Sequence, residues 1–375
     1  MTNGFGSLRP RWAVTLALTA TSLAFATSTN ASTAFLGHPL ALSADSHGHV
    51  WVAESDAHGV VEIDPSTGAV LRVVAGPAYG FDGPTAIAVA GGNVWVASAG
   101  FTGSKGNASA ARLTEFSPTT GRLIRIVDLK SHGVQGLSEL WPSGSTLWVS
   151  ASMGNAIVEL DVRTGRILRV FRDGPIVGNS EPSGIVTSDG RVMYVDQGQT
   201  RIVVRDVATG RIARTFTPQI LARAPGTSSK VPFYLGPHLL AVTPTDIWAV
   251  CGAGRHLPTG SVIEIDRRNG HIERSLDAVS NDLYSSSQVA SDAGRLFILG
   301  GPVGTSRGTR GAALTVIDER SGATLYVVHF LRLNGAYSYP RGLTVADGRV
   351  LVSDAGVNSI IVLSPATGHI VRLIR

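Results

Sequence analysis

A short apolar hairpin recurs along this chain and constrains its fold more than any other feature. The first copy, VVEIDPSTGAVLRVV at residues 60–74, alternates apolar and polar residues on both sides of a Thr-Gly pair. Alternation predicts strands with one buried face, and the glycine suits the positive φ of a tight turn. Six further copies follow: RLTEFSPTTGRLIRIV from 112, IVELDVRTGRILRVF from 157, IVVRDVATGRIARTF from 202, VIEIDRRNGHIERSL from 262, LTVIDERSGATLYVV from 314 and IIVLSPATGHIVRLI from 360.

The spacing of these hairpins predicts the architecture. The turn glycines fall at Gly68, Gly121, Gly165, Gly210, Gly270, Gly322 and Gly368, at intervals of 53, 44, 45, 60, 52 and 46 residues. A second hairpin precedes each, as in PTAIAVAGGNVWVAS from residue 84, so each unit has four strands, A to D. A period near 50 with four short strands is typical of a propeller blade. We therefore predict an all-β fold, a seven-bladed β-propeller of four-stranded antiparallel blades, over residues 39–375.

The units are expected to fold as one domain, because no blade can bury both its faces alone. Seven complete blades run from Leu40 to Ile374, which leaves no strand exchange to close the ring; Ser32–Leu36 could add a strand to the last blade. A large side chain recurs in strand B and is expected to pack between blades. These residues are Trp51, Trp95, Trp148, Tyr194, Trp248 and Phe297, with Leu351 in the seventh unit.

Two stretches resemble known propeller repeats. Residues 182–210, PSGIVTSDGRVMYVDQGQTRIVVRDVATG, are similar to an NHL repeat, and IVELDVRTGRILRV from 157 resembles the YVTN hairpin. The likeness to the YVTN and NHL propeller families covers nearly all of the mature chain. These families include binding scaffolds, lactonases and a streptogramin-type lyase, so the resemblance implies a fold and leaves the activity open.

The N-terminus has the form of a secretory signal peptide at residues 1–26. Arg9 and Arg11 precede an apolar run that ends in the small-x-small pattern Ala24-Phe25-Ala26. The alternative is an uncleaved anchor, but the run is shorter than the ~20 residues that a spanning helix needs. We expect residues 27–38 to form an N-terminal segment of a secreted protein, extracellular or in the periplasmic or cell-wall space, with no membrane span after cleavage.

Composition narrows the classes of partner. The net charge is +5, but the arginines are scattered, whereas a nucleic-acid site would need a clustered basic patch. The single cysteine, Cys251, excludes an internal disulfide framework and is expected to be a buried small apolar residue. We therefore expect a monomer that binds a protein or a cell-envelope glycan, and no nucleic acid.

Variation among the seven copies falls on one face of the predicted ring. The A–B and C–D turns, on the plain face, are short and nearly uniform. The B–C loops and D–A connections, on the looped face, carry the sizeable insertions, at 99–111, 217–237, 251–260 and 300–312. Because loops on rigid scaffolds commonly carry function, we expect a binding face here; tolerated insertions are the alternative.

The candidate ligand-binding residues lie where strands A begin and strands B end, near the channel mouth. Glu54, Asp354 and Arg341 are expected to form a charged cluster because blades 1 and 7 are neighbours, with His238 facing them. The alternative is that Asp354 pairs with Arg341 and that Glu54 is solvated. The full set of ligand-binding candidates is Glu54, Gln135, Glu181, Asp196, Arg341 and Asp354.

Two function classes remain open. The first is a non-catalytic scaffold that needs no cofactor. The second, implied by the lyase and lactonase relatives, is an enzyme with calcium or magnesium near the mouth and His238 as its catalytic residue, although Leu239 departs from the Gly-Pro-x-Gly pattern of lyase-type repeats. His256 lies in an inserted loop and could assist. The His47-Gly48-His49 turn invites a metal interpretation, but it lies on the plain face. We favour the scaffold.

Overall fold

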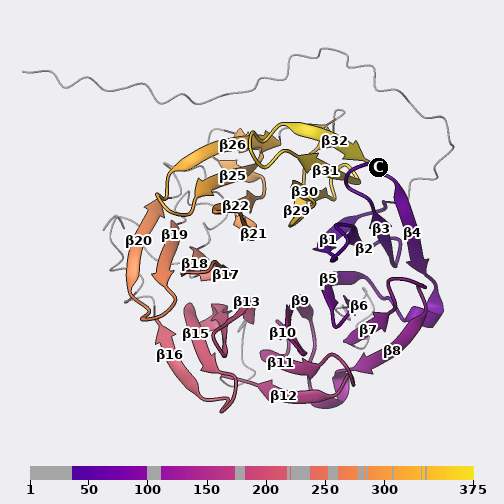
Figure 1. Ribbon diagram of the computed structural model, residues 1–375, viewed down its shortest axis with the longest axis horizontal. Coiled ribbons are helices and arrows are strands. Elements are labelled where there is room, and N and C mark those ends of the chain that lie inside the picture. Colours follow the sequence, from indigo (N-terminus) through magenta and orange to yellow (C-terminus); the bar gives the residue numbers. More distant parts are fainter. Residues whose placement is uncertain are drawn as a thin grey trace, which may run out of the picture.

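The computed structural model confirms the seven-bladed β-propeller (Figure 1). Its described residues form seven four-stranded antiparallel sheets, arranged as a ring around a central opening. Within each sheet the strands follow chain order from the inner edge of the ring to the rim. The structure describes residues 36–98, 111–173, 182–217, 220, 237–251, 261–277, 283, 286–305, 308–330, 332–333 and 336–375.

The two inner strands of each blade form a hairpin beside the central opening. The innermost A strands are β1 (Pro39–Ala44), β5 (Pro84–Ala90), β9 (Leu137–Ser143), β13 (Pro182–Ser188), β17 (Pro237–Val242), β21 (Ser286–Asp292) and β29 (Pro340–Ala346). The B strands are β2 (Val50–Glu54), β6 (Asn93–Ser98), β10 (Thr146–Ala151), β14 (Arg191–Asp196), β18 (Asp246–Cys251), β22 (Arg295–Gly300) and β30 (Arg349–Asp354).

The recurring hairpins of the sequence form the two outer strands. The C strands are β3 (Gly59–Ile63), β7 (Arg112–Phe116), β11 (Ala156–Asp161), β15 (Arg201–Asp206), β19 (Ser261–Asp266), β25 (Ala312–Asp318) and β31 (Ser359–Leu363). The D strands, at the rim, are β4 (Val70–Ala75), β8 (Leu123–Asp128), β12 (Ile167–Phe171), β16 (Ile212–Phe216), β20 (Ile272–Asp277), β26 (Thr324–Phe330) and β32 (Ile370–Ile374).

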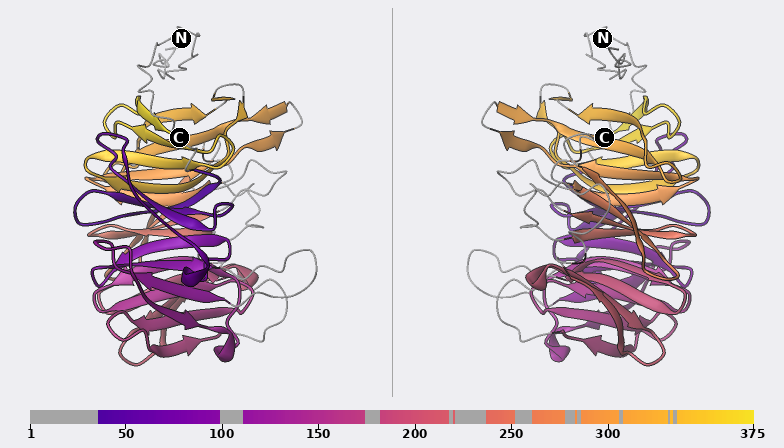
Figure 2. Two further views of the ribbon diagram at one scale, coloured as in Figure 1. Left: turned by 90° about the vertical axis from the view of Figure 1, so that its right-hand side faces the viewer. Right: turned by 90° about the vertical axis from the view of Figure 1, so that its left-hand side faces the viewer.

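Small elements decorate the connections. Two short ribbons pair within blade 6 and after it, and Figure 2 shows orange strands of this region extending beyond the stacked blades. The ribbon strands are β23 (Val303–Thr305), β24 (Gly308–Arg310), β27 (Arg332–Leu333) and β28 (Ala336–Tyr337). Three 3-10 turns are described: η1 (Pro77–Tyr79), η2 (Lys130–His132) and η3 (Gln197–Gln199).

Side-chain hydrogen bonds join the last blade to the first. Among the described residues no strand is exchanged between these two blades. At the channel, Ser353 Oγ donates to the carbonyl of Leu40 at 3.1 Å. At the rim, Arg372 Nη2 donates to the carbonyl of Ser66, in the C–D turn of blade 1, at 3.2 Å. The same contact joins blades 2 and 3, where Arg125 Nη2 donates to the carbonyl of Arg163 at 3.0 Å. The ring therefore closes with the interblade contact that it uses elsewhere.

The repeated Asp-x-x-Thr-Gly sequence is explained by the C–D turn, which is longer than the predicted two-residue turn. The amide of Gly68 donates to the carbonyl of Asp64 at 2.7 Å, and the amide of Asp64 donates to the carbonyl of Ala69 at 2.9 Å. Gly68 has φ 78°, as the prediction required. The Asp64 carboxylate accepts the hydroxyl hydrogens of Ser66 and Thr67 at 2.6 and 2.7 Å, and these bonds lower its pKa. Each aspartate thus caps its own turn.

The large B-strand side chains fill the spaces between blades, as predicted, except in blade 4. Trp51, Trp95, Trp148, Trp248, Phe297 and Leu351 are at most 1% exposed. Tyr194 is buried, but the prediction of its position was wrong. By strand register the residue equivalent to Trp248 is Met193, which packs toward blade 5, because both are third in their strands. Tyr194 lies one residue later and therefore faces Trp148 of blade 3.

Several sequence predictions lie outside the described residues. These are the signal peptide at 1–26, nearly all of the Ser32–Leu36 strand, most of the inserted loops, Glu181 and His256. Leu36, where the description begins, is 2% exposed and packs in the core between blades 1 and 7. Among the described residues, no helix has the length and apolar character needed to cross a bilayer.

Candidate functional site

The central channel encloses a cavity with a volume of about 550 Å³. Its wall is formed by the seven A strands, whose inner edges face the opening in Figure 1. Its lining mixes aliphatic residues, such as Leu40 and Leu42, with polar ones, such as Thr85, Gln288 and Asp292, and the surface that it exposes is more polar than apolar. The volume is within the range of small-ligand sites.

Glu54 ends β2 near the looped mouth, where it is fully buried rather than solvated. Its Oε2 accepts the amide hydrogens of Gly37 and His38, at 2.8 and 3.0 Å, in the segment that leads into β1. Its Oε1 is buried without a hydrogen-bond partner among the described atoms. Burial raises the pKa of this carboxyl to about 7, although the two amide bonds oppose the rise. Glu54 is therefore partly protonated near neutral pH.

Asp354 holds the same repeat position in blade 7, and its carboxylate likewise accepts hydrogen bonds from residues of its own blade. It is fully buried, accepts the Ser338 hydroxyl hydrogen and the amide hydrogens of Tyr339 at 2.8 Å and Gly356 at 3.0 Å. Arg341 is exposed and lies over the Tyr339 ring, 4.5 Å from its centroid.

The expected cluster of Glu54, Asp354 and Arg341 is not formed among the described residues. Neither is the alternative ion pair between Asp354 and Arg341. Both carboxylates instead accept amide hydrogens from the segment that precedes strand A.

The remaining candidates that the structure describes are Asp196, Gln135 and His238. Asp196 is 5% exposed and accepts from the Gln199 amide at 3.1 Å and from Arg201 Nε at 3.0 Å. Gln135 is exposed and lies two residues before β9, so the prediction that it lies where strand A begins was wrong. His238 is the second residue of β17, as expected.

Sequence reasoning missed Glu139, a carboxylate in the channel wall. Glu139 is the third residue of β9 and is partly exposed. Its Oε2 accepts the Ile185 amide hydrogen, from β13 of the next blade, at 3.1 Å, and the Gly184 amide also bonds to the carboxylate. Burial within the wall raises its pKa. Comparison of the seven repeats could have revealed it, because the residues at the equivalent strand A position in blades 1, 2 and 7 are Ala41, Ala86 and Gly342.

The His47-Gly48-His49 turn forms part of a polar cluster on the plain face. Ligand atoms of Asp45, His49 and Glu62 lie within 4.8 Å of one another. Asp45 also accepts from Trp51 Nε1, and Glu62 pairs with Arg72 Nε at 3.2 Å.

Blade 2 shows what this cluster does. There, Asn93 Nδ2 donates to Glu115 Oε1 at 2.7 Å, just as His49 Nδ1 contacts Glu62 Oε1 at 3.0 Å. Because asparagine makes the equivalent contact, the His49 cluster is a variant of a structural motif.

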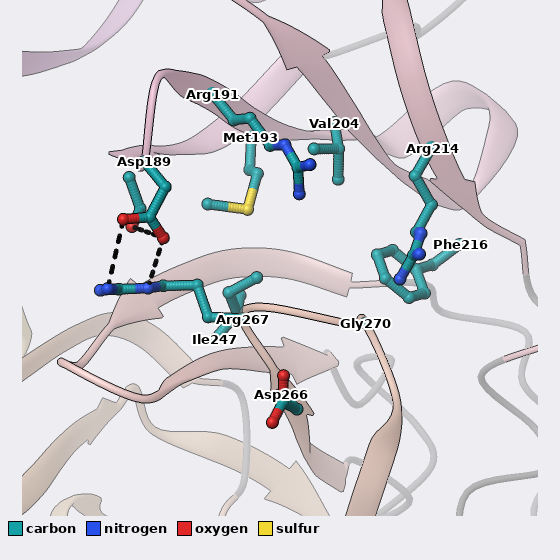
Figure 3. Close-up of a pocket in the computed structure, with 11 residues that line it drawn as sticks. Asp189, Arg191, Met193, Val204, Arg214, Phe216, Ile247, Asp266, Arg267 and Gly270 are labelled. Carbon is teal, nitrogen blue, oxygen red and sulfur yellow. Dashed lines mark hydrogen bonds and ion pairs between the residues drawn. The ribbon is translucent and has the colours of Figure 1, made fainter.

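A second pocket, between blades 4 and 5, is far smaller than the channel. Figure 3 shows Asp189 bridged to Arg267, with Met193 and Val204 to the side of the pair. The Asp189 Oδ2 to Arg267 Nε distance is 2.8 Å. The cavity volume is about 20 Å³, which holds no more than about one water. Cys251 also offers no reactive site, because its thiol is 3% exposed and burial raises its pKa to about 12.

Comparison with known protein families identifies the family of this chain. Residues 109–372, more than half of its length, match the family described as outer membrane protein assembly factor BamB. The chain belongs to this family. No curated protein matches the chain by sequence.

Two solved structures resemble this BamB-family propeller in fold. A streptogramin B lyase has a TM-score of 0.60 and 14% identity, and the alignment covers 86% of this chain and 92% of the lyase. The β-propeller domain of Cps50 (Swd1) from Myceliophteria thermophila has a TM-score of 0.61 and 12% identity, covering 87% and 96%. At these identities the likeness concerns the fold alone.

Proposed function

We propose that this protein is a secreted, non-catalytic scaffold whose looped face binds a partner protein or a cell-envelope glycan. The observation that carries the proposal is the difference between its two faces. On the plain face the turn geometry repeats: Gly68, Gly165, Gly270 and Gly368 all have φ between 71° and 78°. The sizeable insertions of the sequence fall in the connections of the other face.

Family and site support the same proposal. The family description names an outer membrane protein assembly factor, and a scaffold that binds proteins is compatible with that description. The carboxylates near the looped mouth, Glu54 and Asp354, are occupied with amides of their own blades. We also assign the finer kinship to the YVTN and NHL repeat proteins here, on the hairpin sequences.

The test is a comparison of trimmed variants. In one, the insertions at 99–110 and 252–260 are each replaced by a four-residue turn; in the control, residues 65–68 on the plain face are replaced by the equivalent turn of blade 3. Co-sedimentation with a bacterial cell-envelope preparation should be lost in the first and kept in the second. Binding by both, or loss in the control alone, would contradict the proposal.

The alternative is a metal-dependent lyase or lactonase at the looped mouth. It is supported by the resemblance of the repeats and by the fold of streptogramin B lyase. It requires that EDTA lower the unfolding temperature reversibly and that His238→Ala abolish turnover of a lactone or streptogramin substrate. Neither effect is expected for the scaffold.

A further inference from the structure

The segment that leads into the last blade exposes alternate side chains beside the looped mouth. Tyr337, Tyr339 and Arg341 are exposed, whereas Ser338 and Pro340 between them are buried. Alternate residues of an extended segment point to opposite sides, so the three exposed side chains share one side. The Arg341 guanidinium accordingly lies over the Tyr339 ring, 4.5 Å from its centroid. We call these three exposed residues the Tyr-Tyr-Arg stripe.

Contacts on the buried side of this segment hold the stripe in place. Ser338, 3% exposed, donates its hydroxyl hydrogen to Asp354, and the Tyr339 amide donates to Asp354 Oδ1 at 2.8 Å. At the other end of the segment, Tyr337 pairs with Arg332 in the ribbon of β27 and β28. Because the backbone is held at both ends, the stripe has little conformational freedom to lose when a ligand binds.

The propeller repeat does not account for the exposure of Tyr337. In four other blades the residue three positions before strand A is an apolar residue at most 8% exposed, whereas Tyr337 is 65% exposed. The equivalent residues of blades 4 and 5 lie outside the described part of the chain. An exposed ring at a position where the repeat buries an apolar side chain indicates a surface available to a partner. The four buried residues are Leu36, Phe81, Val134 and Leu283.

Arg341 also departs from the repeat. It is the second residue of its A strand and lines the looped end of the channel. No other A strand has an arginine, lysine or carboxylate at this position, and within the described part of the chain Arg341 forms no ion pair. Glu54 and Asp354, which end the B strands of blades 1 and 7, are fully buried. The second residues of the other A strands are Leu40, Thr85, Ser138, Ser183, His238 and Ser287.

The charge of the looped face favours an acidic partner. The sizeable insertions that the sequence assigns to this face contain six basic residues and no acidic one: Lys105, Arg223, Lys230, Arg255, Arg307 and Arg310. The net charge of the whole chain is +5, so these insertions account for its excess of positive charge. Clustered charge of one sign attracts partners of the opposite sign and fixes their orientation.

We propose that the Tyr-Tyr-Arg stripe binds an acidic peptide segment of a partner protein. A carboxylate of the peptide accepts hydrogen bonds from the Arg341 guanidinium, and apolar side chains of the peptide pack on the rings of Tyr337 and Tyr339. Tyrosine and arginine are enriched among the residues that dominate protein–protein binding, which favours a peptide over a glycan. This inference rests on the looped-face scaffold proposed above and names the class of its partner.

A fluorescently labelled ten-residue peptide of glutamate, leucine and serine tests the proposal on the purified protein at pH 7.5, by anisotropy. The control peptide has glutamine in place of every glutamate. The acidic peptide should bind at least about tenfold more tightly than the control, because its hydrogen bonds to the guanidinium are charge-assisted, and added salt should reduce this preference. Equal binding of the two peptides, or no binding, overturns the proposal. Tighter binding of oligogalacturonate, an acidic glycan, also overturns it.

Matched variants then locate the contact. Arg341→Gln should bind the two peptides equally. Arg349→Gln removes one positive charge from the plain-face end of the same blade and should keep the preference. Tyr337→Ala should weaken the binding of both peptides alike and leave the Tm unchanged, because the ring is exposed. The assignment is overturned if the preference survives in Arg341→Gln, is lost in Arg349→Gln, or if Tyr337→Ala binds both peptides as the parent does.

Co-sedimentation with the cell-envelope preparation separates this inference from the scaffold proposal. Arg341→Gln should reduce co-sedimentation, as trimming of the insertions should. If trimming abolishes co-sedimentation and Arg341→Gln leaves it unchanged, the stripe is not the contact and the scaffold proposal stands. If neither change has an effect, both proposals fail.

Discussion

Replacing Glu54 with glutamine should stabilise this protein above neutral pH. The native state holds the Glu54 pKa at about 7, above the ordinary glutamate value of 4.5, chiefly because burial disfavours the charged form. The folded chain therefore retains a proton that the unfolded chain has released between these two values. Stability from this group must fall as pH rises through that window, and it is lowest above pH 7.

The magnitude follows from the shift. A difference of about 2.5 pKa units corresponds to about 3 kcal/mol, since one unit is worth about 1.36 kcal/mol. Glutamine keeps a carbonyl oxygen for the Gly37 and His38 amides but cannot ionise. Glu54→Gln should therefore match the parent near pH 5 and exceed it at pH 8 by up to about 3 kcal/mol. For a propeller of this length, that is a Tm rise of about 4 °C.

Denaturant and thermal unfolding at pH 5 and pH 8 measure this difference. The matched control is Asp354→Asn, at the same repeat position, where the carboxylate accepts three hydrogen bonds; this change should lower stability at pH 8 rather than raise it. The reasoning is refuted if Glu54→Gln is no more stable than the parent at pH 8, or if its advantage is equal at both pH values.

Three further predictions concern the repeat and its closure. Asp161 caps its turn, and the hydrogen bonds of the cap lower its pKa. Asp161→Ala should therefore reduce the Tm at pH 7, and the difference in Tm from the parent should shrink as the pH falls below about 4, because the parent's aspartate protonates there. A difference in Tm that stays constant with pH would contradict this prediction. Arg372→Ala should speed hydrogen exchange in β4 and β32, which flank the lost contact, and lower stability by about 1 kcal/mol, whereas Arg125→Ala should leave those strands protected. Trp248→Ala should cost about 3–5 kcal/mol in denaturant unfolding, and a loss below about 1 kcal/mol would show that the blade 5–6 space is not packed as described.

The architecture could be predicted from the sequence because the same hairpin pattern recurs seven times along the chain. Alternating apolar residues and a glycine at a near-constant interval fix four strands per unit, and no other fold buries seven such units in one ring. The position of Tyr194 could not be predicted in the same way. An aromatic residue one position from Met193 satisfies composition equally well, and only strand register shows which of them faces blade 5.

The candidate site was harder to predict because its determinants cross between segments. Glu54 accepts hydrogen bonds from the amides of residues 37 and 38, and a contact with a backbone amide leaves no residue signature in the sequence. Glu139 is distinguished only by its contrast with Ala41, Ala86 and Gly342, which requires the bulged register of the A strands. Gln135 was wrongly placed at the start of strand A because the sequence does not show that β9 begins at Leu137.

The most direct test of the scaffold proposal is a photo-crosslinking map of the two faces. A photoreactive residue placed at 104, 256 or 306 samples the insertions that the sequence assigns to the looped face, and one placed at Ser66, Thr120 or Thr209 samples the C–D turns of the plain face. In the presence of a bacterial cell-envelope preparation, the proposal predicts one recurrent adduct from the first set and none from the second. Recurrent adducts from the plain face, or none from either face, would contradict it.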